Sequence, residues 1–135
     1  PPLPPPLPQP RTPPWAGGAW PHTRPLRRMA RWDGMFPLFD VFGPEQEPVF
    51  AEAVAFVLSE RQRLGLDGPF DVIKMGMTPG DDPAEAAARL NPAANAGATW
   101  WLELIMPEVY GFYPTDPQAF AVLRNRVLQG PPAAG

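Results

Sequence analysis

Residues 15–39 constrain the fold of this chain most, because they have the pattern of a strand, a glycine turn, a helix and a second strand. Trp15-Ala16 is typical of the end of a short buried strand, and Gly17-Gly18 is typical of a tight turn. Thr23 is in position to cap a helix with apolar residues at helical spacing, and Asp33-Gly34 ends that helix. We therefore expect a βαβ unit at this point of the chain.

A glycine turn that leads into a helix can also bind an anion. Free backbone N–H groups and the positive end of the helix then point in the same direction. The pair Gly17-Gly18 is consistent with such a site. A compact turn that only needs a positive φ explains the pair equally well, so both interpretations stay open.

Further helices and strands follow in alternation. Residues 48–64 predict a helix whose apolar face has one polar member, Arg61. Residues 82–85 form a capping box with proline at the first helical position, and they open an alanine-rich helix. Strands are expected at residues 70–77 and 99–105. The last helix begins near Thr115 and is expected to direct three apolar side chains inward, namely Phe120, Leu123 and Val127.

Four successive strand–helix pairs with short connections predict an α/β fold, in which right-handed crossovers join parallel strands. A complete (β/α)₈ TIM barrel takes about 250 residues. The 135 residues of this chain, with four βα units, therefore predict half of a TIM barrel over residues 13–130. Such a half-barrel has an inner face that must be covered, and Met75, Met77 and Trp101 are expected on it.

The N-terminal tail is rich in proline, with PPLP at residues 1–4 and again at 5–8. Such a run cannot enter a helix or a central strand. We expect residues 1–12 to be a disordered tail, and residues 131–135 to be a second one. The alternative is that the PPLP repeats recruit a proline-binding partner, which would make the chain a non-catalytic binding or assembly module.

Composition excludes several classes of function. The net charge is −3 and the Lys and Arg residues form no dominant patch, so we expect neither nucleic acid nor a membrane as a partner. Without cysteine and with one histidine, a metal site is not expected. No apolar run approaches the roughly 20 residues that span a bilayer, and no signal peptide is visible. We expect a cytoplasmic protein. The first residue is Pro, so the sequence is expected to be a fragment of a longer one.

Four segments resemble the C-terminal half of luciferase-like, flavin-dependent oxidoreductases and monooxygenases, in the order of that family. They are WAGGAWPHTRPLRRMARWDGMFP, FDVIKMGMTPGDDPAEAA, NAGATWWLE and RNRVLQGPP, spread over residues 14–132. The family is a (β/α)₈ barrel that uses FMN or a deazaflavin coenzyme. The resemblance thus implies a flavin and a small-molecule substrate as ligands. The upstream half-barrel is absent, which implies a homo-oligomer or a missing half, and the fragment is not expected to be active alone.

The resemblance also implies site residues. In relatives the glycine segment and the start of the next helix help to bind the flavin phosphate, which here corresponds to Gly17, Gly18, Ala19, Trp20 and Arg24. The barrel fold places functional groups at the carboxyl ends of its strands.

Two residues are candidates for catalysis, each with a plainer explanation. His22 follows the glycine pair and is suited to proton transfer or a hydrogen bond to the flavin, or is simply a histidine of a surface loop. Glu103 is a candidate acid or base, and either faces the barrel interior or meets a neighbouring helix. Lys74, in mid-strand, departs from the family pattern and needs a partner, because burying an unpaired charge costs several kcal/mol.

Overall fold

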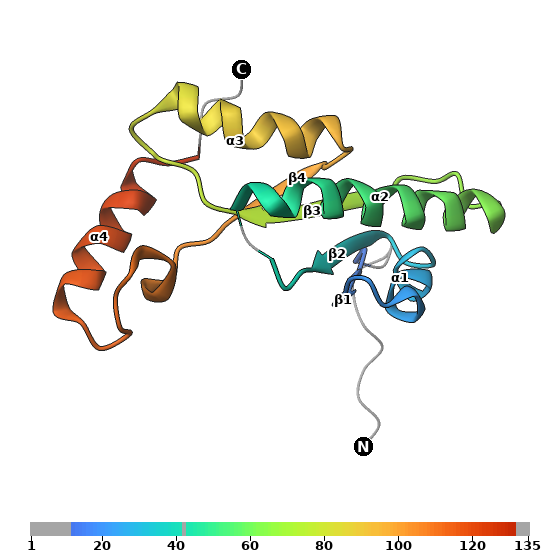
Figure 1. Ribbon diagram of the computed structural model, residues 1–135, viewed down its shortest axis with the longest axis horizontal. Helices are drawn as coiled ribbons and strands as arrows, with labels where there is room; N and C mark the ends of the chain where they lie inside the picture. The colour runs from blue at the N-terminus through green and yellow to red at the C-terminus, as the bar shows by residue number, and fades with distance from the viewer. Residues whose placement is uncertain (1–11, 42, 132–135) are drawn as a thin grey trace.

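The computed structural model describes residues 12–41 and 43–131 (Figure 1). Its strands are β1 (Trp15–Ala19), β2 (Gly34–Leu38), β3 (Asp71–Gly76) and β4 (Trp100–Glu103). Its α-helices are α1 (Thr23–Met29), α2 (Gln46–Arg63), α3 (Pro83–Asn95) and α4 (Pro117–Leu128), and its 3₁₀ helices are η1 (Gly43–Glu45) and η2 (Pro107–Tyr110). The PPLP repeats lie outside the described residues, as do nearly all of the two predicted tails, so those predictions stay predictions.

The four strands are parallel and lie in the order β1-β2-β3-β4, which confirms the predicted α/β fold with a parallel sheet. β1 and β2 pair along their whole length. β2 and β3 pair only at their amino ends, where Gly34 lies opposite Asp71 and Met35 opposite Val72. β3 then pairs with β4 from Ile73 to Gly76. The ladder between β2 and β3 is therefore interrupted toward their carboxyl ends.

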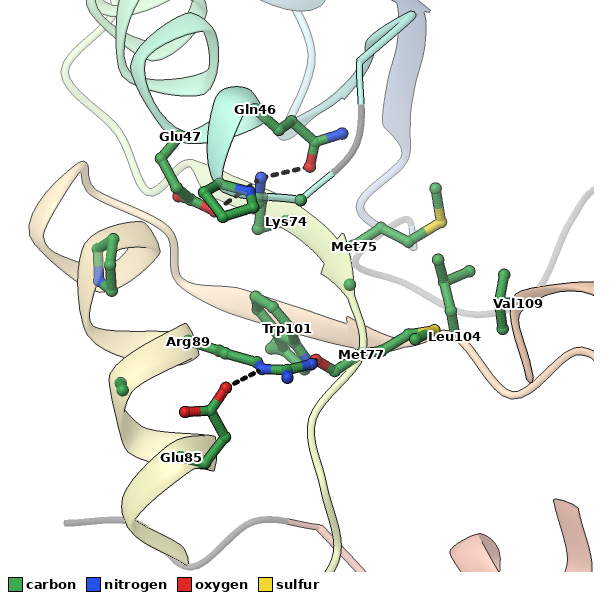
Figure 2. A pocket seen from close by; sticks show the side chains of 15 residues that line it. Gln46, Glu47, Lys74, Met75, Met77, Glu85, Arg89, Trp101, Leu104 and Val109 are labelled. Carbon is green, nitrogen blue, oxygen red and sulfur yellow. Dashed lines mark hydrogen bonds and ion pairs between the residues drawn. The ribbon is translucent and has the colours of Figure 1, made fainter. Parts of the chain in front are cut away.

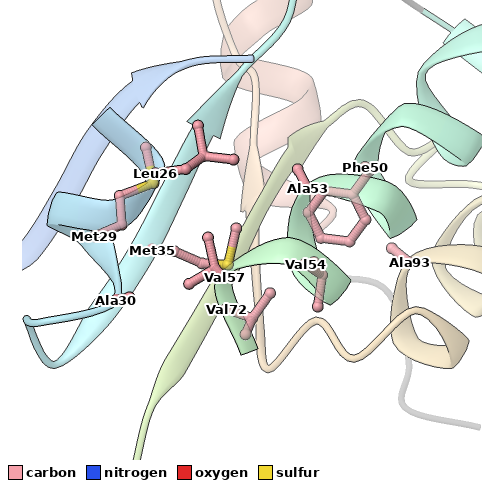
Figure 3. Packing of buried hydrophobic residues seen from close by; sticks show 10 residues of the cluster. All are labelled: Leu26, Met29, Ala30, Met35, Phe50, Ala53, Val54, Val57, Val72 and Ala93. Carbon is pink, nitrogen blue, oxygen red and sulfur yellow. The ribbon is translucent and has the colours of Figure 1, made fainter. Parts of the chain in front are cut away.

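One face of the sheet is covered by helices. With this strand order, each right-handed crossover advances by one strand in the same direction, which places the connecting helices on one face. Met35 and Val72, which are opposite each other in neighbouring strands, both point to that face. They pack in one apolar cluster with residues of α1, α2 and α3 (Figure 3): Leu26, Met29, Ala30, Phe50, Ala53, Val54, Val57 and Ala93.

The opposite face is covered at its amino end by two tryptophans. Trp15 reaches from β1 across β2, and its Nε1 donates a hydrogen bond to Asp71 Oδ2 on β3. A Cβ on Gly34 would lie 2.5 Å from Trp15 Cδ1, so glycine is needed where the indole crosses β2. The ring centroid of Trp15 lies 5.4 Å from that of Trp100 on β4. This face also carries the fully buried Ile73.

Farther along the strands, this second face is apolar and partly open. Side chains alternate between faces along a strand, so Phe36, Leu38, Met75 and Leu102 follow the two tryptophans. Leu38 is 44% exposed. Met75 lies on this face as expected, but Trp101 does not. Trp101 lies opposite Lys74 and packs against the helix-covered cluster, because it is one residue out of phase with Leu102.

Gly17 and Gly18 do not form the predicted turn. Both lie within β1, opposite Phe36 and Pro37, and neither has a positive φ. Their small size is used for packing instead: a Cβ on Gly18 would lie 2.5 Å from Cβ of Pro25 in α1. The predicted cap is also wrong. His22 occupies the N-cap position of α1 without a side-chain hydrogen bond, and Thr23 is the first helical residue.

The structure explains why Arg61 is a polar member of the otherwise apolar face of α2. Its side chain is buried, and its guanidinium donates to the carbonyl oxygens of Ala30 and Trp32, at 3.1 and 3.3 Å, and of Gly68, at 3.0 Å. The guanidinium also stacks 4.1 Å from the ring centroid of Phe70. The carbonyls at the end of a helix lack intrahelical donors, so Arg61 satisfies the end of α1 while it packs α2 against it.

The last helix differs from its prediction. Phe120 and Val127 of α4 are 74% and 59% exposed, whereas Ala119 and Arg126 are buried. α4 lies at one end of the sheet, next to η2, rather than over the strands (Figure 1). The prediction that Phe120 and Val127 point inward is therefore wrong, whereas Leu123 between them is half-buried. Its N-cap is Asp116, which accepts a hydrogen bond from the backbone N–H of Gln118 at 2.8 Å.

Substituting each of the two glycines of β1 by alanine tests whether Gly18 is needed for packing against α1. Gly18→Ala places a methyl group against Pro25 and within 3.1 Å of Met29 Cε, so we expect the free energy of unfolding to fall by about 1–3 kcal/mol. In Gly17→Ala the new Cβ meets only the Phe36 carbonyl oxygen, at 3.5 Å, so we expect little change. Urea unfolding of both variants measures this. Equal losses would contradict the contact with α1.

Candidate functional site

Glu103, at the carboxyl end of β4, is the centre of a hydrogen-bond network. Its Oε1 accepts from the backbone N–H of Thr78 at 2.6 Å, and its Oε2 accepts from the Thr78 hydroxyl at 2.8 Å. Oε2 also accepts from Trp101 Nε1 at 2.9 Å. The guanidinium of Arg126 lies 3.4 Å from Oε1. Of the two alternatives from the sequence, the structure therefore has Glu103 meeting a neighbouring helix, α4.

Arg126 links this carboxylate to the loop after β3. Its Nε donates to the Thr78 carbonyl and its Nη2 to the Thr78 hydroxyl, both at 3.0 Å, and its Nη1 donates to the Gly130 carbonyl at 2.7 Å. Arg126 and Thr78 are both buried. Burial, reinforced by the negative charge of Glu103, raises the pKa of the nearby Tyr110 hydroxyl above 10.0. Because its oxygens already accept from this chain, Glu103 acts here as a positioning residue that holds β4, the loop and α4 together.

Lys74 is another buried charge near this site. It lies in β3, is 3% exposed, and its Nζ donates to Gln46 Oε1 and lies 3.3 Å from Glu47 Oε1 at the start of α2. Nζ also lies 4.9 Å from the ring centroid of Phe50. Burial lowers the pKa of the Lys74 ammonium below 10.5, and the neighbouring Glu47 carboxylate partly offsets that effect. The sequence predicted that this charge needs a partner, and α2 supplies it.

A cavity of about 620 Å³ lies beside Lys74, at the carboxyl-terminal half of β3 and between α2 and α3 (Figure 2). Its walls include Trp101, Met77 and Leu104, with Lys74 and Glu47 at one end and the Glu85–Arg89 ion pair on α3. The volume falls within the range of about 300–1,000 Å³ that is typical of ligand pockets. No sequence pattern predicts this cavity, because its walls come from segments that are far apart in the chain.

Trp101 connects the cavity to the Glu103 network. A Cβ on Gly76 would lie 2.5 Å from Trp101 Cη2, so the indole rests directly on the backbone of β3. One side of the indole lines the cavity, and its N–H is the donor to Glu103. The wall of the cavity is thereby fixed by the same carboxylate that joins β4 to α4.

The residues that the resemblance assigns to the flavin phosphate lie around the end of β1 and the start of α1. Ala19 ends β1, Trp20 packs edge-to-face on Phe56 with 6.4 Å between ring centroids, and Arg24 is exposed in the first turn of α1. His22 is exposed before that turn. His22 and Glu103 are not on neighbouring strands, because β1 and β4 are the opposite edges of the sheet. The structure does not test the assignment of these residues to a flavin.

The described residues fit one part of a flavin better than the other. The partly open apolar face, with Phe36, Leu38 and Met75, suits a planar ring system. The glycine pair does not form a cradle for the phosphate, because both residues belong to a strand. The space beside Gly18 is filled by Pro25. Arg24 is the positive group that remains for that role. Among residues 12–41 and 43–131, no three His, Asp or Glu side chains are grouped to hold a metal ion.

Comparisons of the chain with protein-family profiles, with curated proteins and with solved structures found no match. Within the part of the chain that the structure describes, no helix combines the length and the apolar character needed to cross a membrane.

Glu103→Gln tests the network. The amide would present a donor where Thr78, Trp101 and Arg126 all donate, so one buried donor loses its acceptor. We expect the free energy of unfolding to fall by about 1–3 kcal/mol in urea titrations. Glu108→Gln, in the exposed part of η2, is the matched control and should change it by less than about 0.5 kcal/mol. Equal effects would show that Glu103 holds nothing in place.

Lys74→Met tests the buried ammonium through the pH dependence of stability. Because the folded pKa lies below the unfolded value, the unfolded chain binds more protons in the interval between the two. The cost of burying the charge is thus fully present below that interval and is lost as pH rises toward 10.5. We expect the stability of the wild type, relative to Lys74→Met, to increase over this rise in thermal unfolding experiments. A difference that stays constant would contradict the lowered pKa.

Proposed function

We propose that this chain is the C-terminal half of a luciferase-like (β/α)₈ barrel, a flavin-dependent oxidoreductase or monooxygenase. The observation that carries the proposal is the arrangement of the sheet. Its strands are parallel and in sequence order, helices cover one face, and the other face is apolar and partly open at the carboxyl ends. In a barrel this second face is the interior, and the carboxyl ends are where ligands bind. The four sequence segments that resemble the family support the same conclusion.

The complementary half of the barrel would come from a second copy of the chain or from a missing segment. Two surfaces of the described chain are suited to pack against it. One is the second face of the sheet, which includes Phe36, Leu38 and Leu102. The other is the exposed stripe of α4, with Phe120 and Val127. Large exposed apolar patches mark interfaces, so the proposal assigns both surfaces to closure of the barrel.

The cofactor, FMN or a deazaflavin, would supply the redox chemistry. That chemistry is either hydride transfer between the flavin and a small-molecule substrate, or activation of O₂ at the flavin. The residues of this chain would bind and orient it. The apolar side chains Phe36, Leu38 and Met75 would contact the ring and exclude water. Arg24 would neutralise the phosphate. Glu103 would act indirectly, by holding the carboxyl ends of β3 and β4 in place through Thr78 and Arg126.

Leu38→Glu tests the proposal directly. The side chain is already 44% exposed, so the variant should fold, but a charge on the second face should prevent closure of the barrel. We expect the wild type to form a dimer at micromolar concentration in sedimentation velocity and to quench FMN fluorescence. Leu38→Glu should remain monomeric and lose at least about tenfold in affinity for FMN.

Leu58→Glu is the matched control. Leu58 lies on α2, is 40% exposed, and is not part of the second face, so this variant should assemble and bind FMN as the wild type does. A wild-type chain that is a compact monomer, binds no FMN and binds no hydrophobic dye would contradict the proposed function.

A further inference from the structure

The cavity between α2 and α3 lies largely on the other side of the sheet from the flavin site proposed above. Lys74, Gly76 and Trp101, which form one of its walls, point to the helix-covered face of the sheet. The proposed flavin surface is the opposite face. Of its three ring-contacting side chains, Phe36 and Leu38 do not line the cavity, whereas Met75 does. The residues that carry the inference below, Glu47, Lys74 and Trp101, are not part of the proposed flavin surface, so the inference does not depend on the proposed function.

The charges around the cavity neutralise one another. Lys74 pairs with Glu47 at 3.3 Å, and Arg89 donates to Glu85 at 2.8 Å. Arg89 also donates to the Met77 carbonyl at 3.3 Å. A charged ligand would have to displace one of these pairs or enter without a partner, and an unpaired charge in such a site is costly. The cavity thus favours an uncharged molecule.

The remaining walls are apolar and include a flat aromatic surface. Trp101 rests on Gly76 and cannot move toward β3, so its ring offers a fixed plane for another ring. Met75, Met77, Leu104 and Val109 complete this side. Methionine side chains adapt to irregular apolar shapes. These walls suit a planar, largely apolar molecule.

Glu47, at the end of the cavity, has one carboxylate oxygen with an unused hydrogen-bonding capacity. Glu47 lines the cavity, and its Oε1 faces Lys74. Its Oε2 is buried and accepts no hydrogen bond from the described residues. A buried acceptor without a donor is unfavourable. The Glu47 side chain is 28% exposed. A shift of this side chain toward a ligand that donates an N–H or O–H would give the oxygen its missing donor and remove that cost.

We propose that this cavity is a binding site for a neutral, planar, largely apolar molecule that carries a hydrogen-bond donor. The donor is directed to the carboxylate of Glu47, and the ring lies against Trp101.

Three probes of nearly equal shape test the two parts of this proposal: 2-naphthamide, 2-acetylnaphthalene and 2-naphthoate. The first is neutral and has a donor, the second is neutral and has none, and the third is an anion. We expect isothermal titration calorimetry to find 2-naphthamide bound at least about tenfold more tightly than either of the others. Equal affinity for the amide and the ketone, or tightest binding of the carboxylate, would overturn the proposal.

A pair of variants on α3 locates the binding. Ala88 lines the cavity and is exposed, so Ala88→Phe should fill the cavity without disturbing the core, and binding of 2-naphthamide should be lost. Ala84 is one turn earlier, is also exposed and does not line the cavity, so Ala84→Phe should bind as the wild type does. Melting temperatures check that both variants fold. Unchanged binding in a folded Ala88→Phe variant, or no binding by the wild type, would show the inference to be wrong.

Discussion

The handedness of the crossovers is the constraint on which the rest of this structure depends. Because each crossover adds a strand in the same direction, α1, α2 and α3 share one face of the sheet, and Met35 and Val72 of that face are covered within the chain. Among the described residues, the opposite face is covered at its amino end by the pair Trp15 and Trp100. Burial is therefore more complete on the helix-covered face than on the other, at the carboxyl ends. The uncovered part of the second face therefore follows from the handedness of the crossovers, whatever residues occupy it.

Local patterns predicted the elements of the fold well, and they were wrong where one residue type serves two physical purposes. The Asp82 half of the capping box before α3 is confirmed, since Asp82 accepts from the backbone N–H of Glu85 at 3.0 Å, whereas the Glu85 carboxylate accepts from Arg89. Gly97 ends that helix with a positive φ. A missing Cβ, however, permits either a positive φ or close packing. Only the position of Pro25 decides between them for Gly18, and that contact depends on how α1 returns to the sheet.

The candidate sites were less predictable, because their partners are distant in sequence. The expectation that Lys74 needs a counter-charge followed from burial alone, but its partners are 28 and 27 residues earlier, at Gln46 and Glu47. Glu103 was selected as a candidate for catalysis. Its donors Thr78 and Arg126 join it from a loop and a helix whose own residues are 48 positions apart. A sequence pattern identifies a charge that must be satisfied, whereas the tertiary fold determines which group satisfies it.

Trp101 lies between the Glu103 network and the buried Lys74. Its ring lies on the backbone at Gly76, which closes one direction of movement, and its N–H is held by Glu103, which restricts rotation in the plane of the ring. The opposite strand position is Lys74, whose ammonium is held by the start of α2. Trp101 is thus held by two contacts that differ in kind, a steric one at Gly76 and a hydrogen bond to Glu103. A wall of this kind is preorganised, so a ring that binds against it does not have to order the indole first.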